Sequence, residues 1–182
     1  MEFVEPIYDQ KDIPRMRKVI KKQVNGERNL LLFELGLATA LRPSDLLDLR
    51  VEDVKTGIIR GRTNKKNKSF DFRLNDRVFG LVKSFIETMD DNELLFPMHR
   101  TTAYRFLKKA AIDCGLEENI GAHSLRKTKA YHLYTDPTPG SESKNNINLI
   151  MDLLQHDEAG STMRYIGYRK EKLNEMLLAH DL

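Results

Sequence analysis

The stretch Leu153–Tyr168, LLQHDEAGSTMRYIGY, sets the organisation of the chain. An apolar helix end leads into His156, a polar turn containing Gly160 follows, and Ser161 can begin a second helix that carries Tyr165. Such a connection places a histidine and a tyrosine at the two edges of one loop, where both can reach a common ligand. Taken alone the pattern is weak, because a tyrosine on an amphipathic helix is usually a half-buried core residue.

Two other segments, TALRPSDLLDLR and AHSLRKT, supply cationic side chains. Arg42 follows an apolar helix in a tight turn, where a charge needs a partner or a ligand, and a salt bridge to Asp45 or Asp48 is the structural alternative. His123 and Arg126 are three residues apart, so one helical face can present both. A helix cap or a core hydrogen bond would explain His123, and a surface charge would explain Arg126.

Composition limits the possible classes of protein. The 182 residues are 40% hydrophobic and 31% charged, which indicates one globular domain and excludes a disordered or membrane-spanning chain. A single cysteine, Cys114, cannot form an internal disulfide and has the pattern of a buried small residue, so we expect a reducing, cytoplasmic compartment. The net charge of +3 is compatible with nucleic-acid binding.

Apolar periodicity predicts a mainly helical chain with one antiparallel hairpin, over residues 54–74, and a polar loop at 135–146. Residues 27–39 are so apolar that they form the central helix. His99 is interpreted as an incidental loop residue. The other predicted helices run from 9–14 to about 24 and over 44–49, 75–88, 101–114, 122–134, 147–154 and 169–180.

The order Arg-x-x-Asp, lysine on a hairpin, His-x-x-Arg, Leu-x-His and Thr-x-x-Tyr resembles the catalytic domain of the tyrosine recombinases, or phage-type integrases. The resemblance covers nearly the whole chain. It implies an α+β, mainly helical fold with a small antiparallel sheet, and a catalytic domain over residues 1–182. Residues 1–8 are then a linker or a fragment edge, and the separate N-terminal DNA-clamping domain of the family is absent from this sequence.

The resemblance also implies roles for individual residues. Arg42 and Arg126 would hold the scissile phosphate, Asp45 would support Arg42, and Tyr165 would be the nucleophile. His123 would accept the tyrosine proton and His156 would hydrogen-bond the phosphate. Lys65 would protonate the leaving 5′ oxygen, with Lys66 as the alternative because the hairpin register is not fixed by one sequence. The expected DNA contacts are Lys66, Lys68, Arg105 and Lys127.

The implied reaction is the cutting and rejoining of double-stranded DNA at specific sites through a 3′-phosphotyrosyl bond, without metal, cofactor or ATP. We expect a monomer when free of DNA and a homo-tetramer in the synaptic complex, with the last helix docking in cis or in trans. The alternatives are a type IB topoisomerase and a non-catalytic DNA-binding regulator. Two positions depart from the family pattern: Ala40 replaces a common glycine, and Lys127 replaces a frequent second histidine.

Overall fold

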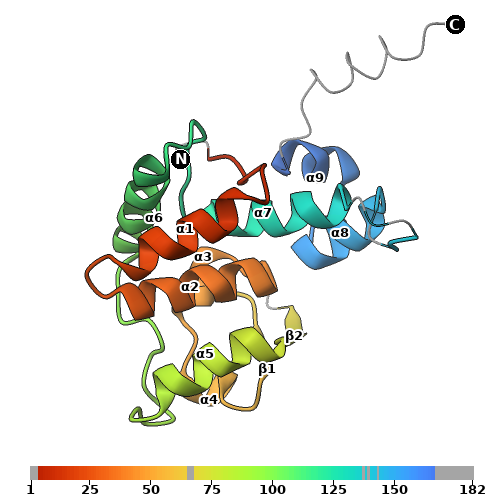
Figure 1. The fold of residues 1–182 in the computed structure, drawn as a ribbon. Coiled ribbons are helices and arrows are strands. Elements are labelled where there is room, and N and C mark those ends of the chain that lie inside the picture. The colour runs from red at the N-terminus through yellow and green to blue at the C-terminus, as the bar shows by residue number, and fades with distance from the viewer. Residues whose placement is uncertain (1–3, 65–67, 137, 139, 143, 167–182) are drawn as a thin grey trace, which may run out of the picture.

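The computed structural model describes residues 4–64, 68–136, 138, 140–142 and 144–166. Within them the fold is mainly helical with a two-stranded antiparallel sheet, which confirms the predicted fold class. The elements in chain order are α1 (Asp12–Lys21), α2 (Gly26–Thr39), α3 (Pro43–Leu47), α4 (Val51–Val54), β1 (Ile58–Arg62), β2 (Ser69–Arg73), α5 (Asp76–Ile86), α6 (Arg100–Cys114), α7 (Ala122–Tyr134), α8 (Ile147–Leu154) and α9 (Ala159–Tyr165). In Figure 1 α2 crosses the middle of the molecule, the hairpin and α5 lie below it, and α7, α8 and α9 lie above and to its right.

The central position of α2 follows from its apolar sequence. Phe33 and Leu35 are completely buried, as predicted for this helix. Gly36 permits close approach of α7, because a Cβ at this position would lie 2.6 Å from Leu125 Cδ1. The one carboxylate buried in α2, that of Glu34, pairs with an arginine from α1 and another from α5. Because Gly36 permits this close approach, the C-terminal end of α2 lies against the first half of α7.

The hairpin has a defined register. Arg62 lies opposite Ser69, and one step further the Thr63 N–H donates to the Lys68 carbonyl at 2.9 Å. The Lys68 N–H in turn donates to Thr63 Oγ1 at 3.3 Å. These two bonds close the loop that the sequence could not place. Residues 65–67, and with them both candidate acid lysines, lie outside the described residues.

Two helix ends are capped by residues for which the sequence predicted no such role. The ring of His99 accepts a hydrogen bond from the Thr101 N–H, so His99 caps α6 and its interpretation as incidental is wrong. Gln155, not a glycine, ends α8 in the left-handed conformation, at φ 49° and ψ 43°. The N–H groups of Gln155 and His156 donate to backbone carbonyls in the last turn of α8, which satisfies that helix end. Gly160 therefore lies inside α9 instead of in the turn.

Residues Val4–Tyr8, expected as a linker or fragment edge, pack along α7, and we refer to them as the N-terminal strap. Ile7 is completely buried. Its N–H donates to Thr128 Oγ1 at 2.9 Å, and its carbonyl accepts from His132 Nε2, also at 2.9 Å. Figure 1 shows the strap passing beside α7 before it enters α1. The strap is thus hydrogen-bonded to α7 through both backbone groups of Ile7.

The buried apolar residues form two clusters. The large one surrounds α2 and includes residues of α1, α3, α5, α6 and α7. The small one consists of Ala130, Ile150, Leu154 and Ile166 and supports residues 147–166, which we call the α8–α9 module. Cys114 belongs to the large cluster, as predicted. None of the described helices is long and apolar enough to cross a membrane.

Candidate active site

Arg126 connects α7 to the ends of two other helices. Its side chain is almost completely buried, with the residue 4% exposed, which rules out the surface-charge alternative. Nη1 donates to the Ala40 carbonyl just past α2, and Nη2 donates to the Leu154 carbonyl at the end of α8, at 2.5 Å. Carbonyls at helix C-termini lack intrahelical partners and carry the negative end of the helix dipole. Burial lowers the pKa of Arg126, but a guanidinium stays charged at any working pH.

Arg42 lies at the N-cap of α3, in an extended backbone conformation that directs the chain from the turn into the helix. The Arg42 Nη1 atom is 3.9 Å from Asp45 Oδ2, and the Asp45 side chain is only 1% exposed. The other carboxylate oxygen of Asp45 accepts the Asn64 N–H at 2.9 Å. Asp45 thus lies within ion-pair distance of Arg42, and the same carboxylate also holds the base of the hairpin loop.

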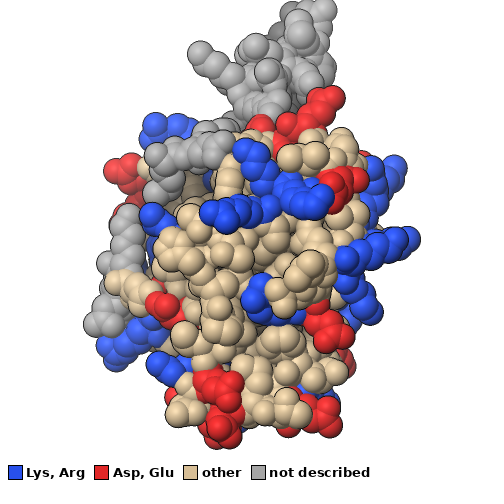
Figure 2. All heavy atoms as spheres, turned by 90° about the vertical axis from the view of Figure 1, so that its left-hand side faces the viewer, with Lys and Arg blue, Asp and Glu red and all other residues tan. Residues whose placement is uncertain are grey.

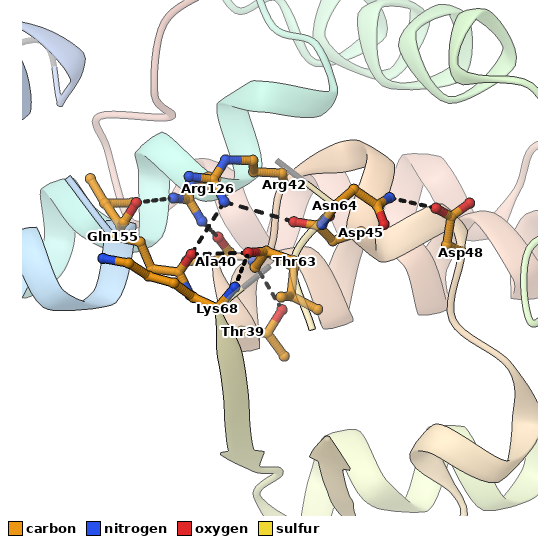
Figure 3. Close-up of polar contacts among 12 residues, drawn as sticks. Thr39, Ala40, Arg42, Asp45, Asp48, Thr63, Asn64, Lys68, Arg126 and Gln155 are labelled. Atoms are coloured by element: carbon orange, nitrogen blue, oxygen red, sulfur yellow. Dashed lines mark hydrogen bonds and ion pairs between the residues drawn. The ribbon is translucent and has the colours of Figure 1, made fainter. Parts of the chain in front are cut away.

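Gln155 joins Arg42 to the hairpin (Figure 3). Its Oε1 accepts from Arg42 Nη1 at 3.5 Å and from Thr63 Oγ1 at 3.3 Å. Asn64, next to Thr63, donates its side-chain amide to Asp48 at 2.6 Å. The start of α3, the hairpin and the end of α8 thus meet at one point, although they are far apart in sequence.

His156 is oriented by a buried threonine. Thr162 is completely buried, and its hydroxyl donates to the Glu158 carbonyl at 3.0 Å. That hydroxyl is 3.1 Å from His156 Nδ1, so we assign the Nδ1 proton to the neutral ring and make Nδ1 the donor. This tautomer leaves Nε2 as the acceptor nitrogen, or as a second donor once the ring is protonated.

Tyr165 lies between His156 and the buried arginine. The rings of His156 and Tyr165 meet edge to face, with centroids 5.1 Å apart and planes at 88°. Burial raises the pKa of Tyr165, while the charge of Arg126, its hydrogen bond to the tyrosine and the charge of Arg42 act in the opposite direction. The tyrosine is therefore a protonated phenol whose anion would form beside two guanidinium groups.

His123 occupies the second position of α7, whose start is fixed by a hydrogen bond from the Gly121 N–H to Ser124 Oγ at 3.0 Å. The side chain is half-buried and lines a pocket of about 460 Å³ together with Arg100 and Tyr104. Burial lowers its pKa first, and the charges of Arg126, Lys127 and Arg42 lower it further. His123 is therefore neutral at neutral pH, as a proton acceptor must be.

Lys127 is one of the four expected DNA contacts, and the structure places it in the interior. It is 6% exposed, and its Nζ donates to the Val4 carbonyl of the N-terminal strap at 2.7 Å. The same Nζ lies 5.0 Å from the centroid of the Tyr165 ring. Lys127 thus lies beside the candidate nucleophile and not on the surface, so DNA contact by this lysine gains no support from its position.

Of the other expected DNA contacts, Lys66 lies outside the described residues, and Lys68 and Arg105 are exposed. Lys68 flanks the hairpin loop and is close to the candidate active site, because its N–H donates to Thr63 Oγ1. Arg105 lies away from the candidate active site, in a groove between α6 and the turn from α1 to α2. Lys22, Arg28 and Lys109 also line this groove. Figure 2 shows this side of the molecule, on which basic side chains are interspersed with acidic and uncharged ones. DNA contact by Lys68 and Arg105 stays a prediction.

Comparisons with known proteins decide the family. The family model described as "Phage integrase family" matches residues 7–172. The chain belongs to the phage integrase family. Among curated integrase-family relatives, the probable integrase/recombinase YoeC of Bacillus subtilis (strain 168) is 35% identical over 179 residues, which cover 92% of this chain and 91% of that protein. Tyrosine recombinase XerD of Staphylococcus saprophyticus is 26% identical over 196 residues, which cover 94% of this chain but only 63% of that relative.

Solved structures of integrase-family proteins share the fold. The XerA recombinase superimposes with a TM-score of 0.71 at 22% identity, over 100% of this chain and 66% of that one. The catalytic domain of bacteriophage HP1 integrase gives 0.65 at 22% identity, over 96% of this chain and 94% of that one. The family model and the curated relatives confirm the predicted tyrosine recombinase catalytic domain and the predicted class of enzyme, and these neighbours confirm the fold.

Several residues of this integrase-family site were not found from the sequence. Gln155 and Thr63 tie the hairpin to Arg42, and Thr162 orients His156. Only Thr162 had a local signal, since it belongs to the Thr-x-x-Tyr pattern. Among the residues that the structure describes, no group of three or more His, Cys, Asp or Glu side chains could hold a metal ion.

Proposed function

We propose that the chain cuts and rejoins double-stranded DNA at specific sites through a 3′-phosphotyrosyl intermediate, with Tyr165 as the nucleophile. The observation that carries this proposal is the position of the Tyr165 ring, next to His156 and within the field of Arg126 and Arg42. A phenol that is hard to ionise becomes a useful nucleophile where cationic donors stabilise the negative charge of the transition state.

In the proposed reaction the Tyr165 oxygen attacks the scissile phosphorus, and the bond from phosphorus to the 5′ oxygen breaks. His123 accepts the phenol proton, and a hairpin lysine, Lys65 in our assignment, gives a proton to the leaving 5′ oxygen. Arg42, Arg126 and His156 neutralise the nonbridging oxygens as charge builds up. A 5′-hydroxyl of another strand then attacks the phosphotyrosyl bond, and the reverse proton transfers restore the free enzyme without ATP.

Two other functions of the same fold are less well supported. A type IB topoisomerase would share this chemistry, but the matched relatives are integrases and recombinases. A non-catalytic regulator has no need of a tyrosine surrounded by two arginines and an oriented histidine, all of which are retained here.

The proposed partner is duplex DNA, in the cytoplasm, with a homo-tetramer in the synaptic complex and a monomer in its absence. Among the fold neighbours, XerH is described bound to its difH substrate, and lambda integrase as a dimer bound to a core site. If phosphate contacts dominate, the affinity of this chain for DNA will fall steeply with salt.

Capture of the covalent intermediate tests the proposal. A nicked suicide substrate, from which the 5′ fragment diffuses away, should yield a denaturant-resistant protein–DNA adduct with the wild-type chain and none with Tyr165→Phe. Tyr168→Phe is the matched control and should form adduct normally. Adduct formation by the Tyr165 variant, or its loss only in the Tyr168 variant, would refute the assignment of the nucleophile.

A second experiment separates the general acid from the phosphate-binding residues. Lys65→Ala should cleave ordinary DNA roughly 10²- to 10⁴-fold more slowly but recover when sulfur replaces the bridging 5′ oxygen, because a thiolate leaves without a proton. Arg42→Ala should stay slow on both substrates. Equal impairment of Lys65→Ala on both would make Lys65 a phosphate contact and direct the same test to Lys66.

A further inference from the structure

A buried lysine adjoins the candidate nucleophile, and it belongs neither to the phosphate-binding pair nor to the proton-transfer groups. Lys127 follows Arg126 on α7, so the two side chains leave the helix in different directions. The guanidinium reaches the ends of α2 and α8, whereas the ammonium lies 5.0 Å from the centroid of the Tyr165 ring. Burial of a lysine costs free energy unless the charge has partners, so the partners of this ammonium indicate its use.

One partner of Lys127 is the backbone of the N-terminal strap, to which Nζ donates at the Val4 carbonyl at 2.7 Å. The strap is itself fixed, because Ile7 bonds to α7 through both its N–H and its carbonyl. The Glu5 N–H also donates to the Asn119 carbonyl at 3.0 Å. The ammonium is therefore held on one side by a well-anchored strap and faces an aromatic ring on the other.

A cation within about 6 Å of an aromatic ring attracts its π-electrons, and the attraction is stronger where water is excluded. For a tyrosine it has a second effect, since a nearby positive charge favours the phenolate over the phenol. An ammonium fixed in this place would therefore restrict the position of the ring and assist its ionisation.

We propose that Lys127 is a positioning residue for the Tyr165 nucleophile, and that the N-terminal strap holds Lys127 in place for this role. The inference rests on the proposed function and adds to it a connection between the segment that enters the domain and the covalent step. It also replaces the expectation that Lys127 contacts DNA.

The groups that face Tyr165 come from several elements. Arg126 and Lys127 lie on α7, Arg42 lies at the start of α3, and His156 lies in the turn between α8 and α9. Glu5 of the strap acts on Lys127, where its charge raises the pKa against the larger lowering by burial. Removal of the Lys127 charge would leave the two guanidinium groups as the cations next to the phenol.

The test compares Lys127→Met with Lys127→Arg in single-turnover adduct formation on the suicide substrate, with DNA affinity measured in parallel. Methionine retains much of the length but loses the charge, so adduct formation should slow roughly tenfold, the size expected from loss of a cation–π contact. DNA affinity should be unchanged, and the pH dependence of the rate should move to higher pH. Lys127→Arg keeps a cation and should recover most of the rate.

Lys129→Met, two residues further on the same helix, is the matched control and should leave the rate and its pH dependence unaltered. A wild-type rate in Lys127→Met would overturn the proposal, as would a rate loss matched by an equal loss of DNA affinity. If Lys127→Met does not fold, Ile7→Ala decides, because a loosened strap should slow adduct formation without weakening DNA binding. Wild-type adduct, measured in every series, shows that the proposed function itself holds.

Discussion

The two arginines and the candidate nucleophile are supported by different parts of the molecule. Arg42 and Arg126 emerge from elements of the large cluster around α2, and Arg126 is fixed by two backbone carbonyls. His156 and Tyr165 belong to the α8–α9 module, whose buried support is the small cluster of Ala130, Ile150, Leu154 and Ile166. The phosphate-binding pair is thus built into the main core, and the nucleophile is carried by a smaller unit.

This difference has a physical consequence for catalysis. Donors that stabilise developing charge are most effective when they need no rearrangement, which suits a pair held by the main core. A unit with less buried apolar surface opens at lower free energy than the core does. We therefore expect the arginines to be preorganised before DNA binds, and the position of Tyr165 to respond to what contacts its module.

Among the substitutions that test this comparison, the largest effect should come from Arg126→Ala, which breaks the connection between the two regions. We expect cleavage to fall roughly 10²- to 10³-fold, because a charged donor to the phosphate is lost. The free energy of unfolding should fall by roughly 3 kcal/mol, because the carbonyls of Ala40 and Leu154 lose their buried partner. Single-turnover rates and denaturant unfolding measure the two losses, and wild-type values for either in Arg126→Ala would contradict the double role.

A pair of cavity substitutions tests the separation of the two clusters. Ile150→Ala should destabilise the module by about 2–5 kcal/mol, and hydrogen exchange should quicken in α8 and α9 with little change in α2. Leu31→Ala, in the large cluster, should lower protection throughout the domain. If both variants accelerate exchange uniformly, the two clusters form one cooperative unit and the comparison fails.

The pH dependence should show the neutral state of His123. Its pKa is lowered, chiefly by burial, so between this pKa and the ordinary value of about 6.5 the unfolded chain binds more protons than the folded chain. The free energy of unfolding should therefore decrease as the pH falls through this window. His123→Gln should reduce the decrease, and His132, whose pKa is also lowered, should account for part of the remainder. Denaturant unfolding at pH values from about 5 to about 8, around the ordinary histidine pKa, measures how the free energy of unfolding changes with pH. The same pH dependence in wild type and His123→Gln would refute the lowered pKa of His123.

The smallest effects concern backbone strain on the two sides. Ala40 and Gln155 both have positive φ, 53° and 49°, in a conformation that favours glycine. Ala40→Gly should raise the free energy of unfolding by about 1 kcal/mol. Gln155→Gly should be more stable than Gln155→Ala by a similar amount, although both lose the bonds to Arg42 and Thr63 and should cleave more slowly than wild type. Equal stability of the two Gln155 variants would show that no strain is stored there.

The sequence predicted those features that depend on local pattern. The bounds of α7 and α8 agree with the predicted ranges, because apolar spacing and capping residues fix them. Ala40, which replaces a common glycine, has a left-handed backbone, and Asp45 lies within ion-pair distance of Arg42. The family resemblance, and not periodicity, assembled the dispersed site residues into one set.

What the sequence did not predict depends on contacts between distant residues. The strap meets α7 across more than a hundred residues, and nothing in MEFVEPIYDQ indicates that Val4 would accept a bond from Lys127. A lysine in a basic segment is usually exposed, so its burial beneath Tyr165 contradicts the average behaviour of the residue type. His99 was missed because its capping role depends on the orientation of its ring, which composition does not specify.

The two hydrogen bonds from Arg126 to the ends of α2 and α8 have a consequence for how this activity can be lost during evolution. A copy of the gene released from selection for recombination, but still selected for a stable fold, can replace Tyr165 by phenylalanine at little cost in folding. The same copy cannot replace Arg126 without leaving two helix ends unpaired. We therefore expect inactive descendants of this chain to lose the tyrosine first and to keep the arginine long after it has no phosphate to hold.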